Sequence, residues 1–159
     1  MEQKTLSKWL KAITIITAIV AALVFYGLVP LYGTRLAAGV PGTEQLFMPW
    51  LIFELIFSVP CFAVLVFCWK IAKNIGEDRS FTADTAKYLK KIATLVGGDT
   101  IFFLVGNLVL FFMNCNILII MLASMVCVIA GFVITVIFSA LSHLVLKASA
   151  IKKENDLTV

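Results

Sequence analysis

The fold is decided by residues 100–146, which read TIFFLVGNLVLFFMNCNILIIMLASMVCVIAGFVITVIFSALSHLVL. This stretch holds no Asp, Glu, Lys or Arg, and as one helix it would be about 70 Å long, because an α-helix rises about 1.5 Å per residue. The hydrocarbon core of a bilayer is roughly 30 Å thick and takes about 20 apolar residues to cross. The stretch is therefore expected to cross twice and to turn at residues 113–116, its one polar, turn-forming cluster.

Composition places the rest of the chain in a membrane as well. Of the 159 residues, 62% are hydrophobic and 14% are charged, whereas soluble domains are about half apolar and a quarter charged. We predict a single domain, an all-α bundle of four antiparallel transmembrane helices, with spans at about residues 13–32, 47–69, 92–112 and 117–146. The first apolar stretch is longer than the core of a signal peptide, so an uncleaved anchor is favoured.

Basic residues predict the orientation of these spans. Twelve of the thirteen lie in the N-terminal arm, in the segment 70–91 or in the tail, and only Arg35 lies on the other side. Because Lys and Arg near span ends stay in the cytoplasm, both termini and a cytoplasmic loop at 70–91 are expected inside a bacterial cytoplasmic membrane. The formal charge of +4 then fits contact with the lipid bilayer, and no direct nucleic-acid partner is expected.

The segment 70–91 reads as a helix end followed by a helix start. Gly76 suits the left-handed backbone of a helix end, and Ser80 or Thr82 suits an N-cap. A short interfacial helix is expected to lead into the third span. Its lipid-facing residues are expected to be Phe81, Leu89 and Ile92. We favour a simple helix elbow here over a dedicated docking surface for a partner.

Four polar residues inside the predicted spans are the candidates for a ligand or proton site. A charged group at membrane depth costs about 2.5–3.5 kcal/mol on insertion scales, so each should face another helix and have a partner there. Helix rise puts Asp99 and His143 in one layer and Glu54 and Asn107 in another. The favoured interpretation is two hydrogen-bonded pairs that hold helices together. The alternative is a small proton-responsive or ligand-binding cavity.

The fourth span carries a stripe of small and polar residues, which recur every four positions and mark a packing face. The helix-packing stripe comprises Cys127, Gly131, Thr135 and Ser139. Successive members turn by about 40° around the helix, so one straight partner is expected to follow only part of the stripe.

Catalytic chemistry finds little support in the sequence. A single histidine leaves no metal-binding cluster of the usual spacing. Residues 96–99 read VGGD, which lacks the first glycine of the G-x-G-D element of intramembrane aspartyl proteases, and no second membrane Asp exists. The four cysteines show no metal or redox spacing. We therefore expect no metal, no cofactor and no enzymatic activity.

Residues 76–92 and the ending KKENDLTV carry a family resemblance. The loop, with Phe81 ahead of the Lys-rich residues 89–92, and above all the fragment ENDLT at 154–158 resemble a bacterial domain-of-unknown-function family of small four-span membrane proteins. Ser80 and Thr85 depart from the Pro and Asn common there. The resemblance implies a multi-pass membrane protein without established activity, often encoded beside a helix-turn-helix regulator, and it assigns no catalytic residue.

Two functional hypotheses follow. The first is a non-enzymatic adaptor or regulatory subunit that acts through helix packing and cytoplasmic contacts, as a homo-oligomer or with a membrane or cytoplasmic protein partner. The second is a small oligomeric transporter, channel component or ligand or proton sensor that uses Glu54, Asp99 and His143.

Overall fold

The chain folds into long helices that account for all four predicted spans. The computed structural model describes residues 3–31, 33–34, 44–114 and 118–157. Helix α1 (Gln3–Ala22) continues into a π-helical turn, η1 (Leu23–Leu28), and is followed by α3 (Glu44–Gly76), α4 (Ala83–Phe112) and α5 (Leu118–Leu157). Four helical stretches are long and apolar enough to cross a membrane: Gln3–Leu31, Phe47–Gly76, Ala83–Phe112 and Met121–Asn155. The described residues contain no strand, so the all-α prediction is confirmed.

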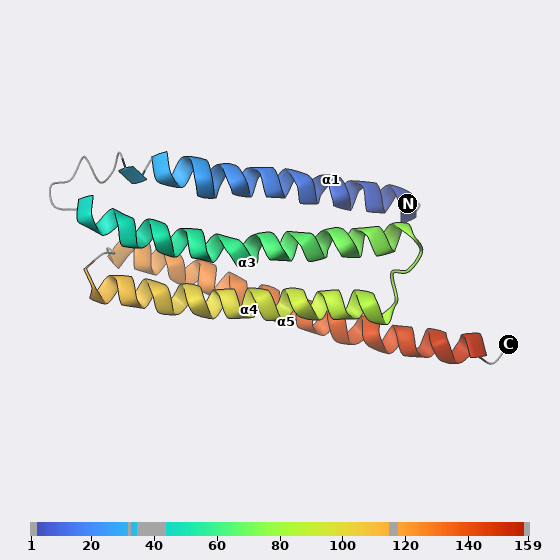
Figure 1. Cartoon of the computed structure of the whole chain (residues 1–159). Helices are drawn as coiled ribbons and strands as arrows, with labels where there is room; N and C mark the ends of the chain where they lie inside the picture. Colours follow the sequence, from blue (N-terminus) through green and yellow to red (C-terminus); the bar gives the residue numbers. More distant parts are fainter. Residues whose placement is uncertain (1–2, 32, 35–43, 115–117, 158–159) are drawn as a thin grey trace.

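The four helices form an open row, in which each helix contacts its neighbours along the chain, and Figure 1 shows α5 crossing behind α4. Helix α1 contacts α3, α3 contacts α4, and α4 contacts α5 over the most extensive interface. Among the described elements, α1 has no contact with α4 or α5, and α3 has none with α5. The two end helices, α1 and α5, therefore each pack against one neighbouring span only.

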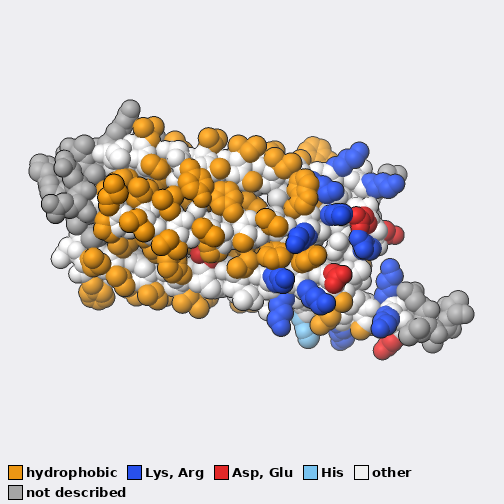
Figure 2. Space-filling view, in the orientation of Figure 1, with side chains coloured by type: hydrophobic (Ala, Val, Ile, Leu, Met, Phe, Trp, Pro, Cys, Tyr) orange, Lys and Arg blue, Asp and Glu red, His pale blue; other side chains and the backbone are white. Residues whose placement is uncertain are grey.

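Contact partners run in opposite order along each pair of neighbouring helices. Near its start α1 meets the end of α3, where Ser7 donates to the carbonyl of Ala72 at 2.6 Å. The start of α4 meets the second half of α5 in the same way, because Ser142 donates to the carbonyl of Ala86 at 2.8 Å. Figure 1 shows these four helix ends at one end of the molecule, and Figure 2 shows the Lys and Arg side chains gathered there, beyond a broad apolar surface.

Glycines let neighbouring helices approach closely. A Cβ added at Gly131 on α5 would collide with Thr100 on α4, and one added at Gly106 on α4 would collide with the ring of Phe53 on α3. Lipid gives no hydrophobic drive for helix association, so close backbone packing is a main source of stability between spans.

The connection between α3 and α4 is short and well bonded. Thr82 is the N-cap of α4, and its hydroxyl accepts a hydrogen bond from the backbone N–H of Thr85 at 3.3 Å. Asn74 at the end of α3 donates to the Thr85 hydroxyl at 3.0 Å, which links the two helix ends. The left-handed residue is Asp78, with φ 58°, and not Gly76 as the sequence suggested. Gly76 is instead the place where Ser7 packs against the end of α3.

The expected short interfacial helix is the first part of α4 itself, which runs without a break from Ala83 to Phe112. Phe81 is exposed as predicted, but Leu89 and Ile92 are buried. The prediction that these two face lipid is wrong. The segment 83–92 packs against neighbouring helices, and the basic residues on its other side had suggested a surface helix.

Candidate functional site

Asp99 is the centre of the polar contacts between α3 and α4. It is 8% exposed, and its Oδ2 accepts a hydrogen bond from the thiol of Cys61 at 3.5 Å. The other carboxylate oxygen, Oδ1, is buried and has no hydrogen-bond partner among the described residues. A thiol is a weak donor, so this carboxyl group is poorly satisfied for its depth in the bundle.

Aromatic rings cover this contact on the side away from the basic end of the molecule. Phe103, one helical turn after Asp99, packs against Phe57 with ring centroids 4.8 Å apart and against Phe53 at 5.9 Å. Glu54 lies two turns before Cys61 on the same side of α3 and is half-buried. The site therefore has an apolar wall and two acidic groups at different depths along one helix interface.

The structure does not join Asp99 to the histidine that the sequence had given it as a partner. His143 is exposed on α5, so the predicted pair of Asp99 and His143 is wrong, and Cys61 occupies the place expected for the histidine. Asn107 is buried, and its amide donates to the carbonyl of Phe103 at 2.9 Å. The pairing of Asn107 with Glu54 stays a prediction.

A second polar contact joins the π-helical turn to α3. Ser58 is fully buried, its hydroxyl lies 3.1 Å from that of Tyr26, and it donates to the carbonyl of Leu55 at 2.7 Å. Sequence reasoning had missed Tyr26. Its position depends on η1, where the backbone N–H of Val29 bonds to the carbonyl of Val24, five residues earlier. No residue pattern in the sequence predicted this π-helical turn.

The predicted packing stripe on α5 is divided between two sides of the helix. Gly131 and Thr135 face α4, where they meet Thr100 and Gly97. Cys127 and Ser139 are exposed. The packing face is completed by Ser124, Val128 and Ser142, which are buried. The expected drift around the helix accounts for the division, because α4 follows only the central members.

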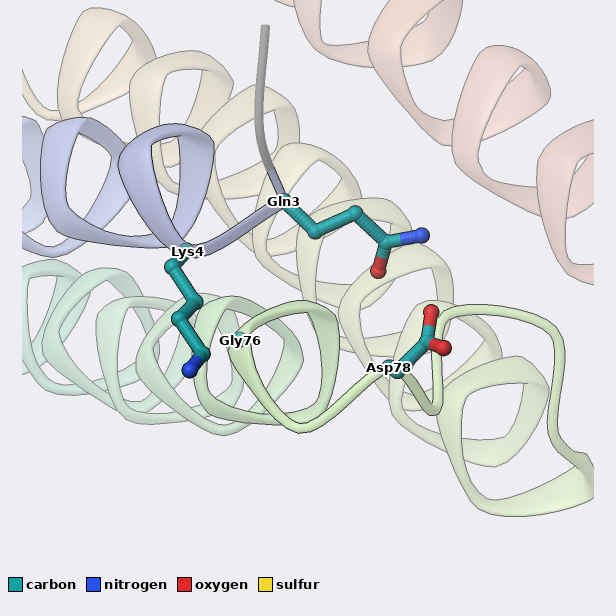
Figure 3. Close-up of a pocket in the computed structure, with 4 residues that line it drawn as sticks. All are labelled: Gln3, Lys4, Gly76 and Asp78. Carbon is teal, nitrogen blue, oxygen red and sulfur yellow. The ribbon is translucent and has the colours of Figure 1, made fainter.

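A shallow hollow lies at the basic end of the molecule, where the start of α1 meets the turn after α3. It has a volume of about 380 Å³ and is lined by Gln3, Lys4, Gly76 and Asp78. Figure 3 shows Gln3 reaching over the turn that carries Asp78. The hollow is open to solvent. No group of three His, Cys, Asp or Glu residues suited to a metal ion occurs in the described ranges.

The fold and these contacts define a four-helix membrane protein whose spans are joined by part-buried polar pairs. The model of the family "Protein of unknown function (DUF2975)" matches residues 31–159. The chain belongs to this family, which confirms the resemblance found in the sequence. Comparison with curated proteins and comparison with solved structures each give no match.

Proposed function

We propose that this chain is a non-enzymatic adaptor or regulatory subunit of a bacterial cytoplasmic membrane, with both termini in the cytoplasm, and that it acts by lateral association with other membrane helices. The observation that carries the proposal is the open row, in which α1 and α5 each contact one neighbouring span. An end helix of such a row keeps most of its surface available to another protein.

The outer side of α5 favours a second copy of the chain as a partner. Ser139 and His143 are exposed there, among apolar residues such as Val136 and Leu144 that are also exposed. Polar groups on a spanning helix are more stable against another helix than against lipid tails, because hydroxyl and imidazole groups hydrogen-bond across helices. Association through this side of α5 covers both polar groups.

The basic end supplies a second surface for contacts. Lys70 lies over the rings of Phe67 and Tyr88, at 5.4 and 5.6 Å from their centroids, and Lys91 lies 5.3 Å from that of Phe67. Neither lysine forms an ion pair with a carboxylate of the described residues. Two such cations held on aromatic rings favour an acidic segment of a cytoplasmic partner.

Cysteine crosslinking in native membranes tests self-association. Cys127 is exposed on α5, whereas Cys61 and Cys68 are half-buried between helices. Cys127 lies about 120° around the helix from Ser139, so the test introduces a cysteine at Ser139 itself. In a Cys115→Ala and Cys127→Ser background, oxidation of Ser139→Cys should give a dimer, and the background alone, the matched control, should give none. A chain that stays monomeric in membranes under oxidation and also runs as a monomer in mild detergent would contradict the proposal.

A second candidate function rests on Asp99. Its unpartnered Oδ1 can accept a proton or a hydrogen bond from a ligand, which favours a ligand or proton sensor, or a subunit of a small oligomeric transporter or channel. Reconstituted protein should then show a pH-dependent flux or response that Asp99→Asn and Glu54→Gln abolish without unfolding the chain. The same response in both variants would exclude this function for the two carboxyl groups.

A further inference from the structure

An apolar groove runs between α1 and α3 on the surface that faces lipid. It has a volume of about 350 Å³ and is open along its length. Ala18 on α1 forms one wall, and Phe62, Val66 and Trp69 on α3 form the other. From Trp69 to Phe62 the groove extends about 10 Å along the helix axis, which is long enough for part of an acyl chain, and it is open to the bilayer.

A cation is held at one end of this groove. The ammonium group of Lys11 lies over the ring of Trp69, 5.7 Å from its centroid, and the side chain is half-buried. No carboxylate of the described residues lies within ion-pair distance of Lys11. The ring orients the ammonium group through a cation–π contact but does not neutralise its charge.

The polarity of the groove matches that of one class of molecule. Its Trp69 end lies toward the basic end of the protein, where a membrane has its headgroups, and its Phe62 end lies deeper among the apolar side chains. Trp is the residue most typical of the boundary between headgroups and acyl chains. A ligand that fits this gradient carries an anionic head and a hydrocarbon tail.

We propose that the α1–α3 groove is a binding site for an anionic glycerophospholipid. One acyl chain lies along Ala18, Phe62 and Val66, and the phosphate is held by Lys11 beside Trp69. A neutral lipid of the same chain length fills the groove equally well, but its headgroup carries a choline cation that offsets the attraction to the lysine. Selectivity for the anionic lipid therefore depends on Lys11, and occupancy by either lipid depends on the space beside Ala18.

Fluorescence quenching of Trp69 tests the site directly. In the full chain with Trp9→Phe and Trp50→Phe, Trp69 is the single tryptophan and is excited selectively at the red edge of its absorption. Vesicles of phosphatidylcholine receive increasing fractions of phosphatidylglycerol with brominated acyl chains, and a parallel series receives brominated phosphatidylcholine. A basic residue near an anionic surface contributes about 1 kcal/mol, so we expect an apparent preference of about fivefold for the anionic lipid.

Three variants separate the parts of the site. Lys11→Gln should remove the preference, and Lys11→Arg should keep it. Lys91→Gln is the matched control, because Lys91 also lies over an aromatic ring at the basic end but is on α4, away from the groove; its preference should be unchanged. Ala18→Phe fills the groove and should reduce quenching by both lipids. Equal quenching by the two lipids, or an unchanged preference in Lys11→Gln, overturns the proposal.

Discussion

The thiol of Cys61 on α3 donates to Oδ2 of Asp99 on α4 at 3.5 Å, while Oδ1 of the same carboxyl group is buried without a partner in the described part of the chain. One weak hydrogen bond is thus all that satisfies an acidic group at this interface. The contact is the most direct place to ask whether Asp99 serves to hold the helices together.

A double-mutant cycle on Cys61 and Asp99 measures the contact. Cys61→Ala removes the donor and leaves both carboxylate oxygens unpaired, so we expect a loss of about 1–3 kcal/mol in the free energy of unfolding. Asp99→Asn should unfold no more easily than the original chain, because it removes a charged group from the interface. In the Asp99→Asn background, Cys61→Ala should then cost less, with a coupling of at least about 0.5 kcal/mol. Denaturation in mixed detergent micelles gives all four values, and additive losses would show that the bond contributes nothing.

Glycine substitutions probe the close approaches along α4 and α5. Gly131→Ala places a methyl group against Thr100, whose β-branched side chain is already bonded to the carbonyl of Val96 at 2.7 Å. The helices must move apart to accommodate it, and we expect a loss of about 1–3 kcal/mol. Gly106→Ala should have a similar effect, because the new methyl group meets the buried ring of Phe53.

Gly98→Ala is the matched control for these two substitutions. A Cβ at Gly98 meets nothing within 4 Å, and alanine is a better helix former than glycine by about 0.5–1 kcal/mol. The variant should be as stable as the original chain or slightly more stable in the same denaturation experiment. If Gly98→Ala destabilised the protein as much as Gly131→Ala, the close packing of α4 on α5 would not explain the losses.

The sequence was sufficient to place the four helices and the most important polar residue. A charge-free run such as 100–146 identifies membrane spans from composition alone, and an Asp in an apolar span is expected to face another helix. The partner of Asp99 could not be predicted, because residue number alone fixes neither the register of two neighbouring helices nor the rotation of each helix about its axis. His143 lies on the exposed side of α5, next to Ser142, which bonds to Ala86. Asp99 lies more than three turns further along α4, where Thr100 meets Gly131.

Local geometry accounts for the other residues that sequence reasoning misplaced. The π-helical turn at Leu23–Leu28 changes the register of the first helix, so that Tyr26 reaches Ser58. Gly76 looked like a left-handed cap, but the turn takes its positive φ at Asp78. Such details depend on how two helices meet at a particular angle, which hydrophobic periodicity alone does not determine.

Serine substitutions on α5 compare its two sides. Ser142 donates to the carbonyl of Ala86 on α4, and hydrogen bonds between spans contribute about 0.6 kcal/mol on average. Ser142→Ala should therefore lower the free energy of unfolding by about that amount, and up to about 1.7 kcal/mol. Ser139→Ala, on the exposed side, should leave the monomer unchanged. If Ser139→Ala destabilised the protein more than Ser142→Ala, the side of α5 that packs against α4 would not be the one described above.

Cysteine labelling tests the predicted orientation, which follows from the basic residues at one end of the molecule. A membrane-impermeant maleimide applied to intact cells should label Cys115, which lies outside the described residues and follows the third span. In a Cys115→Ala background, Phe81→Cys places a thiol at an exposed position beside the N-cap of α4, and it should react only after the membrane is opened. Labelling of Phe81→Cys in intact cells would contradict the predicted orientation. The turn between α3 and α4 would then lie outside the cell with its lysines, against the positive-inside rule.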